Sequence, residues 1–280
     1  MNIRPVLMKP DMAQPGRSSR TELVGDRSGV GLSGSPLSVE ILHVRPGHAG
    51  ETGRRRAWSF LLVWQTGPRG SIVHYGPARD QINPAAGQLV AVPPDVAHTI
   101  VNPNDKHDLV AYEFHAAATT ERSSRAQPFV VSIDDQPFAV SRQGQSIATL
   151  LDGSPGGNCP GSPISAGFVN MRPGHVAEPH QHNDTWVYVL LHESGPLGAN
   201  TLYGPRFDGL IHQQPGQLLV IPPSIPHTAS NPSPTRTITA FEFRANPTIH
   251  VDNIVRDDLR HYLDGQLPVL FDIPAAEASR

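Results

Sequence analysis

The sequence predicts an all-β chain of two tandem barrels with a short helical segment near its C-terminal end, and three observations support this prediction. The chain repeats itself, because a stretch near residue 40 recurs near residue 165. Both copies consist of short apolar runs separated by glycine and proline, of which the 280 residues contain 25 and 29. Patterns with helical spacing are scarce. Each copy is therefore expected to form its own antiparallel sandwich or barrel.

The internal repeat gives the domain organisation. Residues 34–48 match residues 161–175 at an offset of 127, and residues 87–103 match residues 216–232 at an offset of 129. A length of 280 residues is typical of two domains. The predicted order is a tail (1–17), a first barrel (18–115), a linker (116–144), a second barrel (145–245) and a C-terminal tail (246–280).

Two segments outside the repeat carry weaker signals. The apolar residues 129–131 in the linker are candidates for an edge strand. In the C-terminal tail, Ile254, Leu259 and Leu263 lie near helical spacing with Gly265 beyond them, which predicts a helix over residues 253–263.

Composition and charge exclude several classes of function. The 22 basic and 25 acidic residues give a net charge of −3, and the only basic run is Arg54–Arg56, so nucleic acid is not an expected partner. No apolar run is long enough for a membrane span or an export signal, which predicts a cytoplasmic protein. The single cysteine, Cys159, excludes a site with several thiolates, so imidazole and carboxylate groups are the available metal ligands.

Three histidines of the second copy have the spacing of a metal site. His180 and His182 are two residues apart just before an apolar run, and on an extended backbone such residues project from the same face. His227 follows another apolar run and a Pro-Pro turn. Three neutral imidazoles from two strands of a small barrel can converge on one ion and leave other coordination positions open.

These residues resemble the two cupin motifs. The first motif runs from Gly174 through His180 to His182, and the second runs from Gly216 through Pro222 and His227 to Asn231. Both copies match the second motif, the first copy through Gly87, Pro93, His98 and Asn102. The chain therefore resembles a bicupin, which implies two jelly-roll barrels and a metal ion inside one of them.

The sequence departs from the common cupin pattern at one ligand. Most metal-binding cupins have a glutamate four or five residues after the second histidine, where this chain has Trp186 and Val187. Asp184 is nearby, and the sequence leaves open whether it reaches the metal. Cupins without the glutamate resemble the three-histidine dioxygenases. Three neutral ligands leave the full 2+ charge on the ion, which favours an anionic, chelating substrate.

The first copy is predicted to be metal-free. Thr52, Gly53, Arg54 and Arg55 occupy the region of the histidine pair, and an arginine remains protonated and does not bind a cation. His98 alone cannot hold an ion tightly.

Further candidate residues come from differences between the copies. Tyr188 could donate a hydrogen bond to an oxyanion, His212 could act as an acid or base, and Arg206 could bind a substrate carboxylate, so these are the predicted catalytic residues. Glu113 and Glu242 recur in both copies, and recurrence in a metal-free copy indicates a role in folding or at an interface.

The leading hypothesis is a mononuclear non-haem Fe(II) dioxygenase that acts with O2 on a small enolate, phenolate or thiolate. The alternative is a zinc-dependent cyclase, isomerase or lyase, since three histidines and water suit Zn²⁺ equally well, and Mn or Ni also remain open. A non-catalytic bicupin that binds a ligand is the third hypothesis. The expected partners are a small-molecule substrate and a second copy of the chain in a homodimer.

Overall fold

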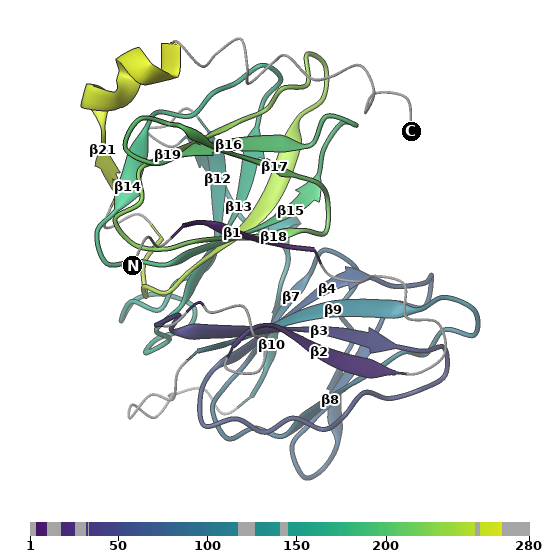
Figure 1. Ribbon diagram of the computed structural model, residues 1–280. Helices are drawn as coiled ribbons and strands as arrows, with labels where there is room; N and C mark the ends of the chain where they lie inside the picture. Colours follow the sequence, from purple (N-terminus) through teal and green to yellow (C-terminus); the bar gives the residue numbers. More distant parts are fainter. Residues whose placement is uncertain are drawn as a thin grey trace. The chain divides into compact units, whose positions relative to one another are not determined.

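The computed structural model describes residues 4–9, 18–25, 32, 34–116, 127–140, 145–249 and 253–264. The chain divides into two compact units, and each contains two antiparallel sheets. The unit called the first barrel comprises residues 10–136 and 152–164; the second barrel comprises residues 1–9, 137–151 and 165–280. The predicted all-β class with two tandem barrels is confirmed (Figure 1).

The first barrel contains a six-stranded and a three-stranded sheet. The larger sheet has the order β10-β7-β4-β9-β3-β2 and the smaller one the order β6-β5-β8. Their bounds are β2 (Ser19–Val24), β3 (Leu37–Val44), β4 (Ser59–Gln65), β5 (Ile72–Tyr75), β6 (Asp80–Ile82), β7 (Leu89–Val92), β8 (His98–Val101), β9 (Leu109–Ala116) and β10 (Phe129–Val131).

The second barrel contains a seven-stranded and a five-stranded sheet, in the orders β1-β18-β15-β20-β13-β12-β11 and β17-β16-β19-β14-β21. The bounds are β1 (Val6–Met8), β11 (Phe138–Val140), β12 (Ser146–Leu151), β13 (Ser165–Met171), β14 (His180–His182), β15 (Val187–Glu193), β16 (Ala199–Tyr203), β17 (Gly209–Gln213), β18 (Leu218–Ile221), β19 (His227–Ser230), β20 (Ile238–Arg244) and β21 (Asn253–Val255). Short 3-10 turns lie at Ile133–Asp135 and Asp257–Leu259.

The strand register shows that the repeat is also a structural one. Glu40 on β3 pairs with Glu113 on β9, and Gly167 on β13 pairs with Glu242 on β20, so residues 127 apart on the first strand of each pair and 129 apart on the second have equivalent places. The two barrels can therefore be compared residue by residue.

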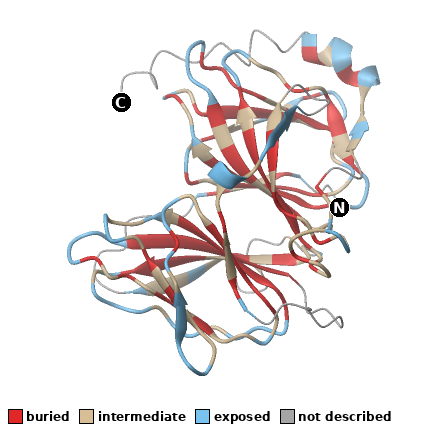
Figure 2. Cartoon of the chain, turned by 180° about the vertical axis from the view of Figure 1, so that it is seen from behind, coloured by how far each residue is buried: buried red, intermediate tan, exposed pale blue. Residues whose placement is uncertain are grey.

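Buried residues run along the strands, and exposed residues gather at the turns (Figure 2). On the central strand β4, the consecutive residues Phe60, Leu61 and Leu62 are all buried. Removal of such a side chain from water contributes about 1.5–3 kcal/mol, so the continuous apolar run stabilises the first barrel from both faces of its sheet.

Segments predicted as tails and linker contribute strands. β1 pairs with β18 in the second barrel, and β10 pairs with β7 at the equivalent edge in the first. The predicted helix over 253–263 begins as strand β21, and helical turns start only at Asp257, because the backbone of residues 253–255 pairs with β14. Parts of the predicted linker and tails lie outside the described residues, namely residues 1–3, 10–17, 117–126, 141–144, 250–252 and 265–280. None of the described helical segments has the length and hydrophobicity to cross a bilayer.

Candidate metal centre

The three histidines of the second copy meet between two neighbouring strands. His180 and His182 are the two ends of the three-residue strand β14, and His227 opens β19 directly opposite His180. One possible ligand atom from each of these residues lies within 4.8 Å of those of the other two. All three side chains are buried. This separation is close enough for the three imidazoles to share one ion after small side-chain rotations.

Hydrogen bonds to the backbone orient two of the rings. Nδ1 of His180 lies 2.9 Å from the carbonyl oxygen of Glu178, and Nδ1 of His227 lies 2.8 Å from the carbonyl oxygen of Ile225. A carbonyl oxygen can only accept, so Nδ1 carries the proton in both rings and Nε2 keeps its lone pair for a metal. In metalloproteins, a hydrogen bond of this kind from the non-ligating ring nitrogen fixes the orientation of a ligating histidine.

The surroundings keep these rings neutral. Burial, followed by the neighbouring His182, lowers the pKa of His180 to about 4. Burial and the two other imidazoles hold the pKa of His227 well below its usual value. Metal binding requires the neutral imidazole, so both rings are in the ligating form at neutral pH.

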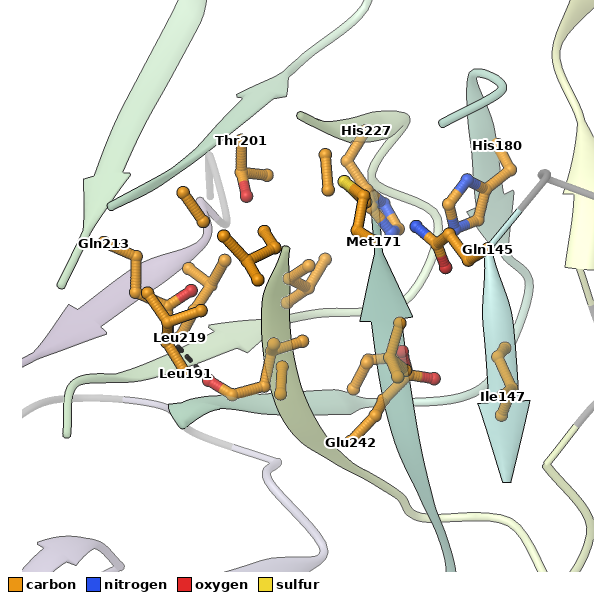
Figure 3. Close-up of a pocket in the computed structure, with 18 of the residues that line it drawn as sticks. Gln145, Ile147, Met171, His180, Leu191, Thr201, Gln213, Leu219, His227 and Glu242 are labelled. Carbon is orange, nitrogen blue, oxygen red and sulfur yellow. Dashed lines mark hydrogen bonds between the residues drawn. The ribbon is translucent and has the colours of Figure 1, made fainter. Parts of the chain in front are cut away.

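A cavity of approximately 80 Å³ extends from the imidazoles between the two sheets of the second barrel. In Figure 3, His180, His227 and Gln145 lie at one end of this pocket, whereas Thr201 and Gln213 lie at the other. The intervening wall is aliphatic and is made by alternate residues of several strands, among them Val169, Met171, Val187, Val189, Leu191, Leu219, Ile221, Ile238 and Ala240. The cavity is thus a small apolar chamber with polar groups at both ends.

A buried ion pair also lines this chamber. Nε of Arg244 donates to Oε1 of Glu242 over 2.6 Å, and Nη1 of Arg244 donates to Oδ1 of Asn253 over 2.8 Å. Burial raises the pKa of Glu242, but the charge of Arg244, the neighbouring imidazoles of His182 and His180, and the hydrogen bond from Arg244 together outweigh burial, so the pKa is lowered and the carboxylate remains ionised. The pair is electrically balanced and leaves the charge of a metal ion beside it largely uncompensated.

No carboxylate joins the three imidazoles among the described residues grouped as possible ligands. Val187 lines the cavity at the place where most cupins have glutamate, and the neighbouring Trp186 is buried but makes no part of the cavity wall. Asp184 is exposed and lies outside the histidine group.

Comparison with solved structures identifies the architecture. Salicylate 1,2-dioxygenase from Pseudoaminobacter salicylatoxidans in complex with gentisate aligns with a TM-score of 0.63 and 13% identity over 87% of this chain and 82% of that one. Oxalate decarboxylase from Lactobacillus farciminis aligns with a TM-score of 0.56 and 14% identity over 87% and 86%. The chain has a bicupin fold. The 7S globulin of Momordica charantia, with a TM-score of 0.54 and 16% identity over 78% and 75%, shares this fold. No protein-family profile and no curated protein sequence matches the chain.

None of the three predicted catalytic residues lines the cavity of the second barrel. Tyr188 is fully buried on β15. Its neighbours Val187 and Val189 line the cavity, so the ring of Tyr188 points to the opposite face of the sheet. His212 turns to Asn200 and Gln214 through its two ring nitrogens, at 2.8 and 2.6 Å. Arg206 is exposed in the turn after β16. The structure therefore places these three residues away from the cavity wall, and their catalytic roles stay predictions.

Glu242 and Arg244 are the functional candidates that the sequence analysis missed. The recurrence of Glu113 and Glu242 suggested a folding role, yet Glu242 contributes to the cavity wall. The available signal was spacing, since residues 242 and 244 lie two apart on one strand and therefore share its inward face. The difference between the copies at this position, His115 against Arg244, pointed to the same place.

Proposed function

We propose that the chain is a mononuclear non-haem metal oxygenase, with Fe(II) held by His180, His182 and His227. The observation that carries the proposal is the meeting of three buried imidazoles, without a carboxylate, at the end of an apolar cavity. The similarity of the fold to salicylate 1,2-dioxygenase supports an oxygenase among the reactions that bicupins perform.

The donor set suits this metal. Imidazole nitrogen is a ligand for Fe(II), and Nε2 of His180 and of His227 has its lone pair available. When bound, Fe(II) supplies the redox chemistry of dioxygen activation, with up to three open coordination positions beside the imidazoles.

The protein selects the substrate by charge and by size. Three neutral ligands leave the centre with a charge of 2+, which attracts an anionic group such as an enolate, phenolate or thiolate. Arg244 adds a cation to the cavity wall, although Glu242 balances it. The cavity of approximately 80 Å³ is smaller than the roughly 150 Å³ that accommodates benzene, so we expect compact enolates and thiolates to be better substrates than phenolates. The aliphatic wall excludes water from the reaction.

The experiment is anaerobic reconstitution of untagged protein with Fe(II), elemental analysis, and oxygen uptake with small diketones, phenols and thiols. We expect about one iron per chain and oxygen consumption with at least one chelating anion. Variant His182→Ala should lose both, whereas the matched variant His212→Ala should keep both, because His212 does not line the cavity. Iron binding without oxygen consumption on any substrate would count against the proposal.

A zinc enzyme that catalyses cyclisation, isomerisation or elimination is the second candidate. The carboxylate of Glu242 in the cavity wall favours it, because such a group can accept a proton from a substrate beside a Lewis-acidic ion. Tight retention of zinc after purification, together with turnover in the absence of oxygen, would favour this candidate over the oxygenase.

A further inference from the structure

The first barrel has a charged cluster at the place where the second barrel has the Glu242–Arg244 ion pair, beside the position that corresponds to its three histidines. Oε2 of Glu40, Nε2 of His115 and Oε2 of Glu113 are close together, with the ring nitrogen 3.0 Å from Glu40 and 3.6 Å from Glu113. One possible ligand atom from each lies within 4.8 Å of the others, and all three side chains are mostly enclosed. His98 donates from Nε2 to the second oxygen of Glu113 over 2.9 Å.

Register equivalence shows how this cluster relates to the histidine centre. His98 opens β8 as His227 opens β19, and Gly53 bridges to His98 as His180 pairs with His227. The imidazole of His180 is thus replaced by a hydrogen atom. A Cβ added at Gly53 would lie 3.3 Å from the His98 ring, so this approach leaves little room for a side chain.

A cation of the protein itself occupies the cluster. Nη1 of Arg20 donates to Oε2 of Glu113 over 2.7 Å and also to Oε2 of Glu40. Arg20 pairs with Leu42 on the neighbouring strand, as Ile147 pairs with Val169 in the second barrel. Since Ile147 lines the second cavity, the guanidinium of Arg20 projects into the equivalent interior space of the first.

The spacing of the anionic and imidazole groups suits a metal ion. Ligand atoms about 2.1 Å from a common ion lie about 3.0 Å apart at an octahedral angle and about 3.4 Å apart at a tetrahedral one. The separations of 3.0 and 3.6 Å from His115 to the two carboxylates are close to these values. Two carboxylates also neutralise a divalent cation, and the hydrogen bond from His98 orients Glu113 as second-shell bonds orient metal ligands.

We propose that the first barrel contains a latent site for a divalent transition metal, formed by Glu40, Glu113 and His115, in which the guanidinium of Arg20 takes the place of the ion. Removal of the guanidinium takes away a permanent cation that contacts both carboxylates, and a divalent ion is a ligand that can take its place. One arginine therefore determines whether the chain has one metal centre or two.

The test uses the untagged full chain with His180→Ala and His182→Ala, so that the second barrel contributes no pair of imidazoles and the result is independent of the proposed oxygenase. In this background, Arg20→Ala should bind about one Co²⁺ per chain. Calorimetry and the visible absorption of bound Co²⁺ measure this binding. The chain that retains Arg20 should bind none. Addition of Glu113→Gln to Arg20→Ala should abolish binding.

Two controls separate a vacated cation site from a general loss of positive charge. Arg55 also contacts Glu40, but its side chain is 44% exposed and its ion pair is with Glu40 and not with Glu113. The variant Arg55→Ala should therefore bind no Co²⁺. Arg20→Lys keeps a cation and should also bind none. Co²⁺ binding by the chain with Arg20, or equal binding by Arg20→Ala and Arg55→Ala, overturns the proposal.

Folding of Arg20→Ala is a readout in its own right. The melting temperature of this variant should rise with Co²⁺ and remain unchanged with Mg²⁺, which prefers oxygen ligands. Should the variant unfold without metal, recovery of the folded state in Co²⁺ supports the site, and failure to recover refutes it.

Discussion

Acid should destabilise the first barrel through Glu113, and the structure gives the magnitude. Burial raises the pKa of this carboxyl, but the hydrogen bond from His98 and the charges of His115, His98 and Arg20 outweigh burial and bring the pKa to about 2. From the ordinary value of 4.5, at 1.36 kcal/mol for each pKa unit, the shift corresponds to roughly 3 kcal/mol of folding free energy. Because the folded-state pKa is the lower one, this stabilisation is fully present above pH 4.5 and is lost as the pH falls through about 2.

Tryptophan fluorescence can isolate the barrel in question. Of the three tryptophans, Trp58 and Trp64 belong to the first barrel and Trp186 to the second. We propose urea unfolding of the Trp186→Phe chain in a chelating buffer between about pH 2 and pH 7, with and without Glu113→Gln. The difference in unfolding free energy between the chain with Glu113 and the Glu113→Gln variant should decrease by roughly 3 kcal/mol as the pH falls from about 7 to about 2.

A matched variant tests whether the effect belongs to the buried network. Glu51→Gln removes an exposed carboxylate of the same barrel and should leave the pH dependence parallel to that of the parent. If the unfolding free energy of Glu113→Gln has the same pH dependence as that of the parent, the buried network does not lower the pKa of Glu113, and this prediction is wrong.

Three further predictions concern the second barrel. Val187→Glu places a carboxylate in the cavity wall, so metal affinity should rise at least roughly tenfold and oxygen uptake with an anionic substrate should fall, because the charge of the centre drops from 2+ to 1+; unchanged affinity in a metal titration would contradict this. Asn253→Ala removes one of the two hydrogen bonds that position Arg244 and should raise the KM for an anionic substrate about tenfold, whereas the control Ile254→Ala, an exposed residue on the same strand, should leave it unchanged. Arg206→Ala should leave steady-state turnover within about twofold of the parent value, since the side chain is exposed. A tenfold loss would indicate that Arg206 contacts the substrate.

The part of the architecture that the sequence predicted follows from local patterns repeated at long range. The copies at residues 34–48 and 161–175 carry the same strand, and the register of β3 and β13 is the same. Two of the strands that escaped prediction, β1 and β21, lie outside the repeat, and their pairing with β18 and β14 depends on tertiary contact that no local pattern records. For residues 253–263, the leucine spacing favoured a helix, but backbone pairing at the first three residues prevailed over it.

The metal ligands and the cavity wall differ in how well sequence could predict them. His180 and His182 share a face because of the period of a strand, and this needs no knowledge of the fold. The same period excludes Tyr188 once Val187 is known to face inward, yet the sequence alone does not tell which of the two does. The role of Arg20 was beyond prediction, because its partners lie 20 and 93 residues away on other strands.

The short ligand strand β14 lies between β19 and β21, and the latter comes about 70 residues after His182 in the sequence. Until that later strand has docked, β14 has an open edge, and its backbone is held on the other side by the pairing of His180 with His227 and by the hydrogen bond from the Ser224 amide to the His182 carbonyl. Two further hydrogen bonds hold β21 beside β14: the backbone amide of Arg256 donates to the carbonyl oxygen of Pro179, and its guanidinium donates to the side-chain oxygen of Gln181. We therefore expect the proposed centre to hold its ion tightly only when β21 has docked beside β14.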